Sequence, residues 1–332
     1  MAAASAARKR RRIAVGRADD YVEISRLGQG AFGAVVKARH RATGQEVAIK
    51  RLRPDADPSE VFREACFLED ASASNPFVHR LVMEFVGPSL SDVLRRHRAA
   101  RAPPMPEASV RAAMRQLLTG AGMLHASGIV HRDIKPQNIL VDEARGALKF
   151  CDFGIAMYTS DPTPHDHVGT LWYKAPEMLL KKSDYDGSQV DAWALGCVMA
   201  EIINDGRPLF GEGLLCEDQL ISILRVLGVP DDGAWPWFSS TPFATDVMPQ
   251  LDILQRCDRS HLRELFPETK LSDEGFQVLS GLLTCNPEKR LTVADALKHP
   301  WFSKIDVLEQ PTKKAAVPLV VRKRRKMHLV SC

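Results

Sequence analysis

The sequence predicts an α+β fold in which a small β-rich part is followed by a larger helical part. Between residues 21 and 86, runs rich in β-formers, such as EVAIKRL at 46–52, are separated by glycines. From about residue 90 to 302, apolar residues recur mostly at helical spacing, as in EASVRAAMRQLL at 107–118. A change of this kind along one chain indicates two lobes, and the cleft between lobes is the usual ligand site.

The elements of the β-rich part can be placed individually. Strands are expected at YVEISRLG (21–28), AVVKARH (34–40), EVAIKRL (46–52) and FVHRLVMEF (77–85). A helix is expected from Pro58 through SEVFREACFLED, where Val61, Phe62, Ala65 and Leu68 lie at helical spacing. The helical part then begins with SLSDVLRRHR at 89–98 and continues with the run from residue 107.

Charge divides the chain into a body and two tails. The net charge is +4, but Arg8–Arg12 and Arg322–Lys326 carry five positive charges each, so the remainder carries −6. We expect a disordered basic arm at 1–18, a folded domain at 19–302 and a basic tail at 303–332. Two basic runs favour nuclear import over solvated tails without a specific role, with cytoplasmic residence left open. Direct nucleic-acid binding is not expected, because no aromatic residues interleave the charges.

The spacing of the cysteines and the hydropathy of the sequence indicate in which cellular environment the protein is expected. The seven cysteines are scattered and form no CxxC pair, which favours reduced thiols over disulfides or a zinc site. No apolar run approaches the ~20 residues of a membrane helix, so no membrane association is expected. The basic run near the start has no apolar stretch behind it, which is not typical of a secretory signal.

A glycine-rich segment, GQGAFGAV at 28–35, lies between two predicted strands. Three glycines allow a backbone to approach a triphosphate without Cβ clashes. Because the segment leads into a strand and not a helix, it favours a kinase-type glycine loop over a dinucleotide turn. By itself the pattern is equally compatible with a glycine-rich hairpin.

Lys50 ends the apolar strand Val47-Ala48-Ile49-Lys50. A lysine in this position can reach the α- and β-phosphates of a nucleotide if a carboxylate fixes its side chain. Glu64, on the following predicted helix, is the expected partner. A lone strand-terminal lysine is usually only solvated, so this assignment depends on the other motifs.

Two short motifs complete the set, HRDIKPQN at 131–138 and CDFG at 151–154. Phosphoryl transfer needs bound metal ions, a base and positive charge at the phosphates. Asp133 is predicted to accept the proton of a substrate hydroxyl, and Lys135 to lie against the transferred phosphate. Asn138 and Asp152 are predicted to bind Mg²⁺. The order of these motifs, followed by Ala-Pro-Glu at 175–177, makes coincidence negligible.

With these motifs, the chain from about Tyr21 to Phe302 resembles the eukaryotic protein kinases, and within them the cyclin-dependent-kinase-like group, particularly the plant F-class. PSEVFRE (58–64), GTLWYKAPE (169–177), VDAWALGCVMAEI (190–202), LGVPDDGAWP (227–236) and NPEKRLTVADALKHPWF (286–302) support the narrower resemblance. IKP in the catalytic loop and Thr170 resemble the serine/threonine branch. The resemblance implies a small N-lobe at about 21–83, a hinge at 84–90 and a C-lobe at 91–302.

The resemblance also implies cofactors, partners and further site residues. ATP, with Mg²⁺, would contact Leu27, Gly28, Gln29, Gly30, Ala31, Phe32, Gly33, Ala34, Val35, Ala48, Lys50, Glu84, Val86 and Leu140. Met83 would be the gatekeeper, Glu177 would pair with Arg290, and Asp191 would brace the catalytic loop. Substrates would be proteins phosphorylated on Ser or Thr before proline, and a cyclin-like activator would bind the helix at 58–68.

The regulatory positions depart from the family pattern. The inhibitory Thr-Tyr pair of the glycine loop is replaced by Ala31-Phe32. His165 stands where the activating phosphothreonine is expected, and Met157 stands in place of one of three phosphate-binding arginines. Either Asp166 supplies a weaker charge to Arg63 and Arg132, or Thr163 serves as the phosphosite.

Two further departures concern specificity and activity. Gly169 and Lys174 replace Val and Arg near the pocket that selects proline, which weakens the inference of proline direction. Residues 65–83 leave little room for two strands, so the fourth strand of the family is expected to be truncated or absent. Leu68, Phe153 and His131 supply most of the hydrophobic column of active kinases, with no fourth member. A weakly active scaffold and a chain lacking a segment are therefore alternatives to an ordinary enzyme.

Overall fold

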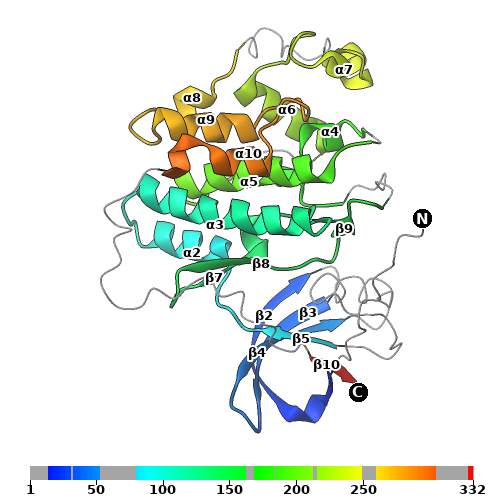
Figure 1. Cartoon of the computed structure of the whole chain (residues 1–332), viewed down its shortest axis with the longest axis vertical. Coiled ribbons are helices and arrows are strands. Elements are labelled where there is room, and N and C mark those ends of the chain that lie inside the picture. The colour runs from blue at the N-terminus through cyan, green and yellow to red at the C-terminus, as the bar shows by residue number, and fades with distance from the viewer. Residues whose placement is uncertain are drawn as a thin grey trace, which may run out of the picture. The chain divides into compact units, whose positions relative to one another are not determined.

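The computed structural model describes residues 14–30, 33–52, 80–161, 168–182, 184–211, 215–248, 259–303 and 328–331. The chain divides into two compact units, which are coloured by residue number in Figure 1. The β-rich unit comprises Met1–Val86, Asp152–Gly154 and Lys313–Cys332, and the helical unit comprises Gly87–Cys151 and Ile155–Thr312. Among the described residues the long strands lie in the first unit and all the α-helices in the second, and the predicted α+β class is confirmed.

The β-rich unit contains one six-stranded sheet. Its strands are β1 (Ala14–Arg17), β2 (Tyr21–Gly30), β3 (Gly33–His40), β4 (Glu46–Leu52), β5 (Arg80–Glu84) and β10 (His328–Ser331). They are hydrogen-bonded in the order β1-β10-β5-β4-β3-β2. The neighbours from β2 to β5 are antiparallel and consecutive among the described strands. Short connections join β2 to β3 and β3 to β4.

Alternation along β3 and β4 gives the sheet two different faces. Val36 lies opposite Ile49 and Ala38 lies opposite Val47, and these four buried side chains form a small apolar cluster. Because side chains alternate along a strand, Lys50 lies on the other face. Val35, Ala48 and Lys50, three of the predicted nucleotide contacts, therefore share the face opposite to the apolar cluster, whereas Ala34 lies on the face of the cluster.

Both ends of the chain contribute strands that sequence analysis did not identify. Residues 14–17, expected as the end of a disordered arm, form β1, and a short 3₁₀ turn (Ala18–Asp20) follows. Residues 328–331, expected within a basic tail, form β10. β1 and β10 pair with each other in parallel, with Ala14 opposite His328. Neither strand is recognisable locally, because each gains its backbone partners from a segment far away in sequence.

The helical unit begins with α2 (Leu90–Ala99) and α3 (Glu107–Ala126), close to the predicted boundaries. The short strands that follow are β6 (Ile129–Val130), β7 (Ile139–Asp142), β8 (Ala147–Phe150) and β9 (Met157–Tyr158). The later helices are α4 (Pro176–Leu179), α5 (Gly187–Ile203), α6 (Cys216–Leu227), α7 (Pro236–Ser239), α8 (Leu262–Leu265), α9 (Asp273–Leu282) and α10 (Val293–Lys298). Single turns occur at Pro136–Asn138, Leu171–Tyr173, Phe243–Val247 and Pro300–Ser303.

Helix α5 is the centre of the core of the helical unit. Every residue from Val190 to Ile203 is buried, as expected for a helix that is apolar on all sides. Asp186 caps its start by accepting a hydrogen bond from the N–H of Ser188 at 2.8 Å. Gly196 allows close packing against α9, since a Cβ there would lie 2.9 Å from a methyl group of Leu283. Among the described helices, none is both long and apolar enough to span a bilayer.

A buried ion pair joins α4 to the segment before α10. Arg290 donates from Nη1 and Nη2 to the two oxygens of Glu177, at 2.7 and 2.8 Å. Both side chains are fully buried, and Arg290 also donates to the carbonyls of Thr284, Cys285 and Gln189. Burying two charges is costly unless both are paired and hydrogen-bonded, which is the case here. The pairing expected from the family resemblance is confirmed.

Candidate active site

The buried carboxylate of Asp191 holds the loop that follows β6. Asp191 of α5 accepts hydrogen bonds from the backbone N–H of His131 and of Arg132, each at 2.9 Å. His125 of α3 lies 2.9 Å from the same carboxylate. These contacts stabilise Arg132 at φ 65°, a conformation uncommon for a residue with a side chain. The expectation that Asp191 braces the loop is confirmed.

His131 links the loop to the end of β8. Its Nδ1 accepts a hydrogen bond from the backbone N–H of Asp133 at 3.3 Å, so the ring proton lies on Nε2. Nε2 then donates to the carbonyl of Cys151 at 3.0 Å. The ring also lies against Phe150, with 5.8 Å between centroids. His131 thereby fixes the backbone of Asp133 against the strand that leads to Asp152.

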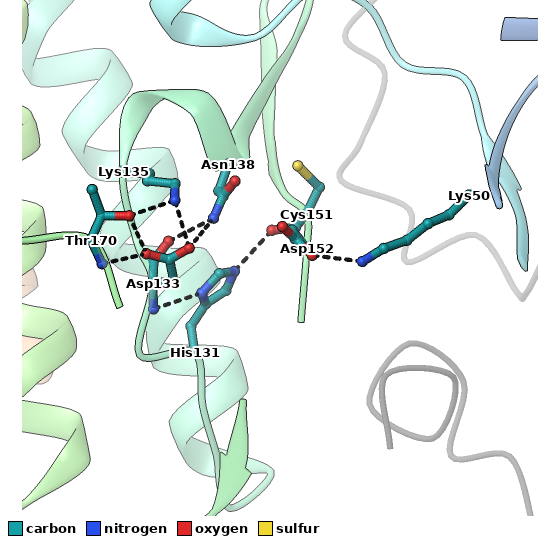
Figure 2. A network of polar contacts seen from close by, with 8 residues as sticks. All are labelled: Lys50, His131, Asp133, Lys135, Asn138, Cys151, Asp152 and Thr170. Carbon is teal, nitrogen blue, oxygen red and sulfur yellow. Dashed lines mark hydrogen bonds and ion pairs between the residues drawn. The ribbon is translucent and has the colours of Figure 1, made fainter. Parts of the chain in front are cut away.

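The carboxylate of Asp133 is the centre of a polar network (Figure 2). Its Oδ2 accepts hydrogen bonds from Nζ of Lys135 at 2.7 Å and from Nδ2 of Asn138 at 2.9 Å. Its Oδ1 accepts from the N–H and the hydroxyl of Thr170, at 3.0 and 2.8 Å. Lys135 also donates to the Thr170 hydroxyl at 2.5 Å. A carboxylate fixed by four donors, one of them cationic, keeps one orientation, which a general base needs.

Asn138 is oriented by the same network. Its Nδ2 also donates to the backbone carbonyl of Asp133 at 2.9 Å. Because Nδ2 makes these contacts, the amide oxygen Oδ1 is the atom available to a cation. An amide oxygen is a ligand that Mg²⁺ accepts. The residues at this position therefore fit the metal that the sequence predicts.

The β-rich unit supplies a second group of predicted residues. Nζ of Lys50, at the end of β4, lies 2.8 Å from Oδ1 of Asp152. The side chain of Lys50 is 7% exposed and that of Asp152 is 41% exposed, so the lysine is held while the carboxylate remains accessible. Asp152 has φ 62°, which marks a sharp turn of the backbone after Cys151. A fixed ammonium beside an accessible carboxylate suits a metal-bound phosphate group.

The glycine loop is the end of the β2–β3 hairpin. Gly28 pairs with Val35, Gln29 with Ala34, and Gly30 with Gly33. Among the described residues, no atom lies within 4 Å of the position of a Cβ on Gly28, and Gly33 has φ 143°. The backbone here is therefore open to a close approach by phosphate oxygens.

The predicted adenine contacts of the β-rich unit follow the sheet register. Val35 lies directly opposite Lys50, and Ala48 lies directly opposite Met83. Glu84 ends β5, and Val86 follows it. Leu27 lies in β2, half-exposed beside a register irregularity. Leu140 lies in β7 of the helical unit, where it pairs with Lys149.

Several predicted residues lie outside the described residues. They are Ala31 and Phe32 of the glycine loop, Glu64 and the helix at 58–68, and the activation-segment residues Thr163, His165 and Asp166. The expected partner of Lys50 and the expected charge beside Arg132 are therefore predictions that rest on sequence. The same applies to Leu68 of the hydrophobic column.

Met157 lies against Arg132 within the helical unit. Nη1 of Arg132 is 3.2 Å from the sulfur of Met157, and both side chains are buried. A thioether is a weak acceptor, so this contact is weaker than a charged one. Met157, which stands in place of the third arginine, thus packs against the guanidinium of Arg132.

Gly169 and Lys174 lie close to the same loop. Gly169 has φ 86°, and a Cβ there would lie 2.9 Å from the carbonyl of Arg132. The segment is anchored by Tyr173, whose hydroxyl donates to Glu201 at 2.6 Å. Burial raises the pKa of Tyr173 and of Glu201, so the phenol is a permanent donor near neutral pH. Thr170 is thereby held in place beside Asp133.

A separate cavity of about 340 Å³ lies in the helical unit, away from this network. Its lining includes Leu227–Asp231 and Ser280–Asn286 in part, together with Lys289. Asn286 donates to the carbonyl of Ala234 at 2.9 Å and Lys289 to that of Gly233 at 2.6 Å. The LGVPDDGAWP and NPEKR motifs therefore hold each other in place through these hydrogen bonds.

Comparison with known proteins agrees with this geometry. The model of the protein kinase domain matches residues 21–302, and the chain belongs to this family. It is 44% identical over 313 residues to a putative cyclin-dependent kinase F-2 of Oryza sativa subsp. japonica, covering 86% of this chain and 90% of the relative. It is 36% identical to cyclin-dependent kinase G1 of Arabidopsis thaliana, covering 92% of this chain and 52% of that protein. Cyclin-dependent kinase G-1 of Oryza sativa subsp. indica is 35% identical, with 86% of this chain and 43% of that protein covered.

These similarities define the chain as a serine/threonine protein kinase that resembles plant cyclin-dependent kinases. They do not favour the alternative of an inactive scaffold. Several contacts of the site were not predicted from the sequence, among them those of Thr170 and Lys135 with Asp133, of Lys50 with Asp152 and of His125 with Asp191. Thr170 lies in the motif GTLWYKAPE, which could have pointed to a role in the site, whereas no motif of the sequence marks His125.

Proposed function

We propose that the protein transfers the γ-phosphate of Mg²⁺-ATP to serine or threonine hydroxyls of proteins, with Asp133 as the catalytic base. The observation that carries this assignment is the network of Lys135, Asn138 and Thr170 around the Asp133 carboxylate. The carboxylate accepts the hydroxyl proton, while the ammonium of Lys135 stabilises charge on the transferred phosphate.

The remaining roles follow from the chemistry of the residues. Lys50 binds the α- and β-phosphates, oriented by the expected Glu64, and the backbone of the glycine loop covers the nucleotide. Oδ1 of Asn138 and the carboxylate of Asp152 would hold Mg²⁺. Magnesium, when bound, neutralises charge on the phosphates.

The test is a comparison of Asp133→Asn with Asp184→Asn, whose side chain is exposed and lies on the surface. Asp133→Asn is expected to lower kcat by about 10²–10⁴-fold, because the base is removed, while nucleotide binding is retained. Radiolabel transfer to a generic substrate measures kcat, and a thermal shift with Mg²⁺-ATP measures binding. Transfer by Asp133→Asn at the wild-type rate would refute the assignment.

Proline direction is a further part of the proposal. It rests on the family resemblance, since Gly169 and Lys174 depart from the usual residues of the proline-selecting pocket; Gly169 adopts its φ of 86° without strain. Peptides that differ only in Pro or Ala at this position should differ in kcat/KM, with the Pro peptide preferred. Equal kcat/KM values would show that Lys174 does not preserve the selectivity of an arginine.

We also propose that a cyclin-like activator binds the helix expected at 58–68, which lies outside the described residues. The PSEVFRE motif and the names of the relatives support this part of the proposal. Co-purification of recombinant cyclins with the wild type, but not with Val61→Asp, and a matching rise in kinase activity would support it. Equal recovery with both proteins would place any cyclin contact elsewhere.

The terminal basic runs are proposed to act together as a nuclear-import signal. Arg12 and Lys326 each stand two residues before the first paired residue of β1 and of β10, and these strands begin at the same end of the sheet because they are parallel. Replacing both runs with alanine should spread a tagged protein into the cytoplasm, and replacing either run alone should give an intermediate distribution. An unchanged nuclear signal after both replacements would show that the runs are only solvated.

A further inference from the structure

The position beside β5 is occupied by the end of the chain. Antiparallel pairing joins β10 to β5, with Val82 opposite His328, Leu81 opposite Leu329 and Arg80 opposite Val330. On its other side β5 pairs with β4, from Glu84 opposite Val47 to Arg80 opposite Arg51. Strands β5 and β10 lie side by side in Figure 1. Residues 80–82 therefore have backbone neighbours on both sides.

A strand has only two hydrogen-bonding edges, and this decides which segment can complete the sheet. Since β4 occupies one edge of β5 and β10 the other, both edges of residues 80–82 are filled by described strands. Without β10, the amide and carbonyl groups of β5 along the edge opposite β4 would lack sheet partners, which is unfavourable and promotes association with other chains.

We propose that the C-terminal segment His328–Ser331 is an integral strand of the kinase domain, which fills the edge of β5 opposite β4. It contributes through its backbone to β5 and, in parallel, to β1. The segment is thus an intramolecular partner of the sheet edge and not part of a free tail. This inference concerns the integrity of the β-rich unit and is independent of the proposed catalytic roles.

Pairing through the backbone requires that the residues of β10 carry an N–H group. Proline lacks the N–H that a ladder needs, whereas alanine retains it. Leu329→Pro combined with Val330→Pro should therefore break the pairing, while Leu329→Ala with Val330→Ala should largely keep it. The two double variants change the same positions and provide a matched comparison.

Hydrogen exchange in the full-length protein measures the pairing directly. In the proline variant, exchange of the amides of residues 80–82 should become about tenfold faster or more, because local opening no longer requires the loss of two ladders. The thermal midpoint should fall by several degrees, and a synthetic peptide of residues 326–332 added in excess should restore part of both losses. The alanine variant should remain close to the wild type. Unchanged protection of residues 80–82 in the proline variant would overturn the proposal.

A cross-linking experiment keeps the proposal testable if the proline variant does not fold. Facing residues of an antiparallel pair have Cα atoms about 4.5–5.5 Å apart, within the range of a disulfide. Leu81→Cys with Leu329→Cys should form a disulfide under mild oxidation, identified by peptide mapping because the chain has seven cysteines of its own. Leu81→Cys with Ser331→Cys, out of register, should not. Absence of the first cross-link, or equal yields of both, would refute the pairing.

Discussion

Asp191 holds the backbone of Arg132 in its left-handed conformation. Oδ1 of Asp191 accepts the N–H of Arg132 at 2.9 Å, and the φ of Arg132 is 65°. The aspartate is fully buried, so water cannot replace it as acceptor. Since Asp133 follows immediately, the direction in which its carboxylate leaves the backbone depends on this contact. Asp191 is a positioning residue for the catalytic loop.

Removing the carboxylate of Asp191 should therefore affect turnover more than nucleotide binding. Asp191→Ala leaves the N–H groups of His131 and Arg132 without their acceptor, which costs about 1–3 kcal/mol for each. We expect a lower kcat with little change in the KM for ATP, and a lower thermal midpoint. Asp191→Asn, which retains one acceptor oxygen, should lie between the alanine variant and the wild type. Equal loss in kcat and in ATP affinity would indicate general unfolding instead of loop positioning.

The buried pair of Glu177 and Arg290 should be strongly coupled. Glu177→Ala or Arg290→Ala alone leaves a buried charge without its partner, with an expected cost of about 3–5 kcal/mol in the free energy of unfolding. The double variant should lose less than the sum of the two, as measured by urea denaturation. The exposed pair Lys298 and Asp295 provides the control, and its removal should change stability little. Strict additivity at Glu177 and Arg290 would contradict the coupling.

Glu107 should contribute stability that depends on pH. It accepts hydrogen bonds from the Ser272 hydroxyl and N–H, at 2.6 and 3.0 Å, and from the Trp301 indole at 2.6 Å. Burial alone would raise its pKa, but the hydrogen bonds from Ser272 and Trp301 lower it overall below the usual 4.5. A lowered folded-state pKa gives stability that is present above the unfolded value and is lost as the pH falls through the folded value.

The measurement is the thermal midpoint of the wild type and of Glu107→Gln as a function of pH. The difference should be largest near neutral pH, where the carboxylate is charged, and should shrink as the pH falls below about 4.5. Glu143→Gln, at an exposed position paired with Arg96, is the matched control. Its thermal midpoint should differ little from that of the wild type at any pH in the series. A difference for Glu107→Gln that does not vary with pH would mean that the charge of Glu107 plays no part.

The activation segment should be ordered without the usual phosphate. His165 replaces the phosphate acceptor, and the sulfur of Met157 lies against Arg132 where a third arginine is expected. A carboxylate at Asp166 carries less charge than a phosphothreonine, so basal activity should be low and insensitive to phosphatase. The comparison is Asp166→Asn with Thr163→Ala, each assayed before and after phosphatase. If phosphatase abolishes wild-type activity and only Thr163→Ala reproduces that loss, Thr163 is the switch.

The predicted catalytic and metal-binding residues can be recognised from sequence alone. Asp133, Asn138 and Asp152 stand in motifs whose spacing is local, and a local pattern is fully visible in one chain. The glycine hairpin and helices α2 and α3 were likewise predicted, because alternation and helical periodicity are properties of contiguous segments.

The groups, distant in sequence, that hold these residues in position are visible only in the tertiary structure. Thr170 lies 37 residues after Asp133 in sequence, yet both its N–H and its hydroxyl bind that carboxylate. His125 and Asp191 meet because α3 and α5 pack together, which no periodicity records. β10 has four residues and no turn or alternation to mark it, so it becomes a strand only through pairing with β5 and β1. Long-range backbone pairing depends on which edge is left open by the rest of the chain, and that is a property of the assembled sheet.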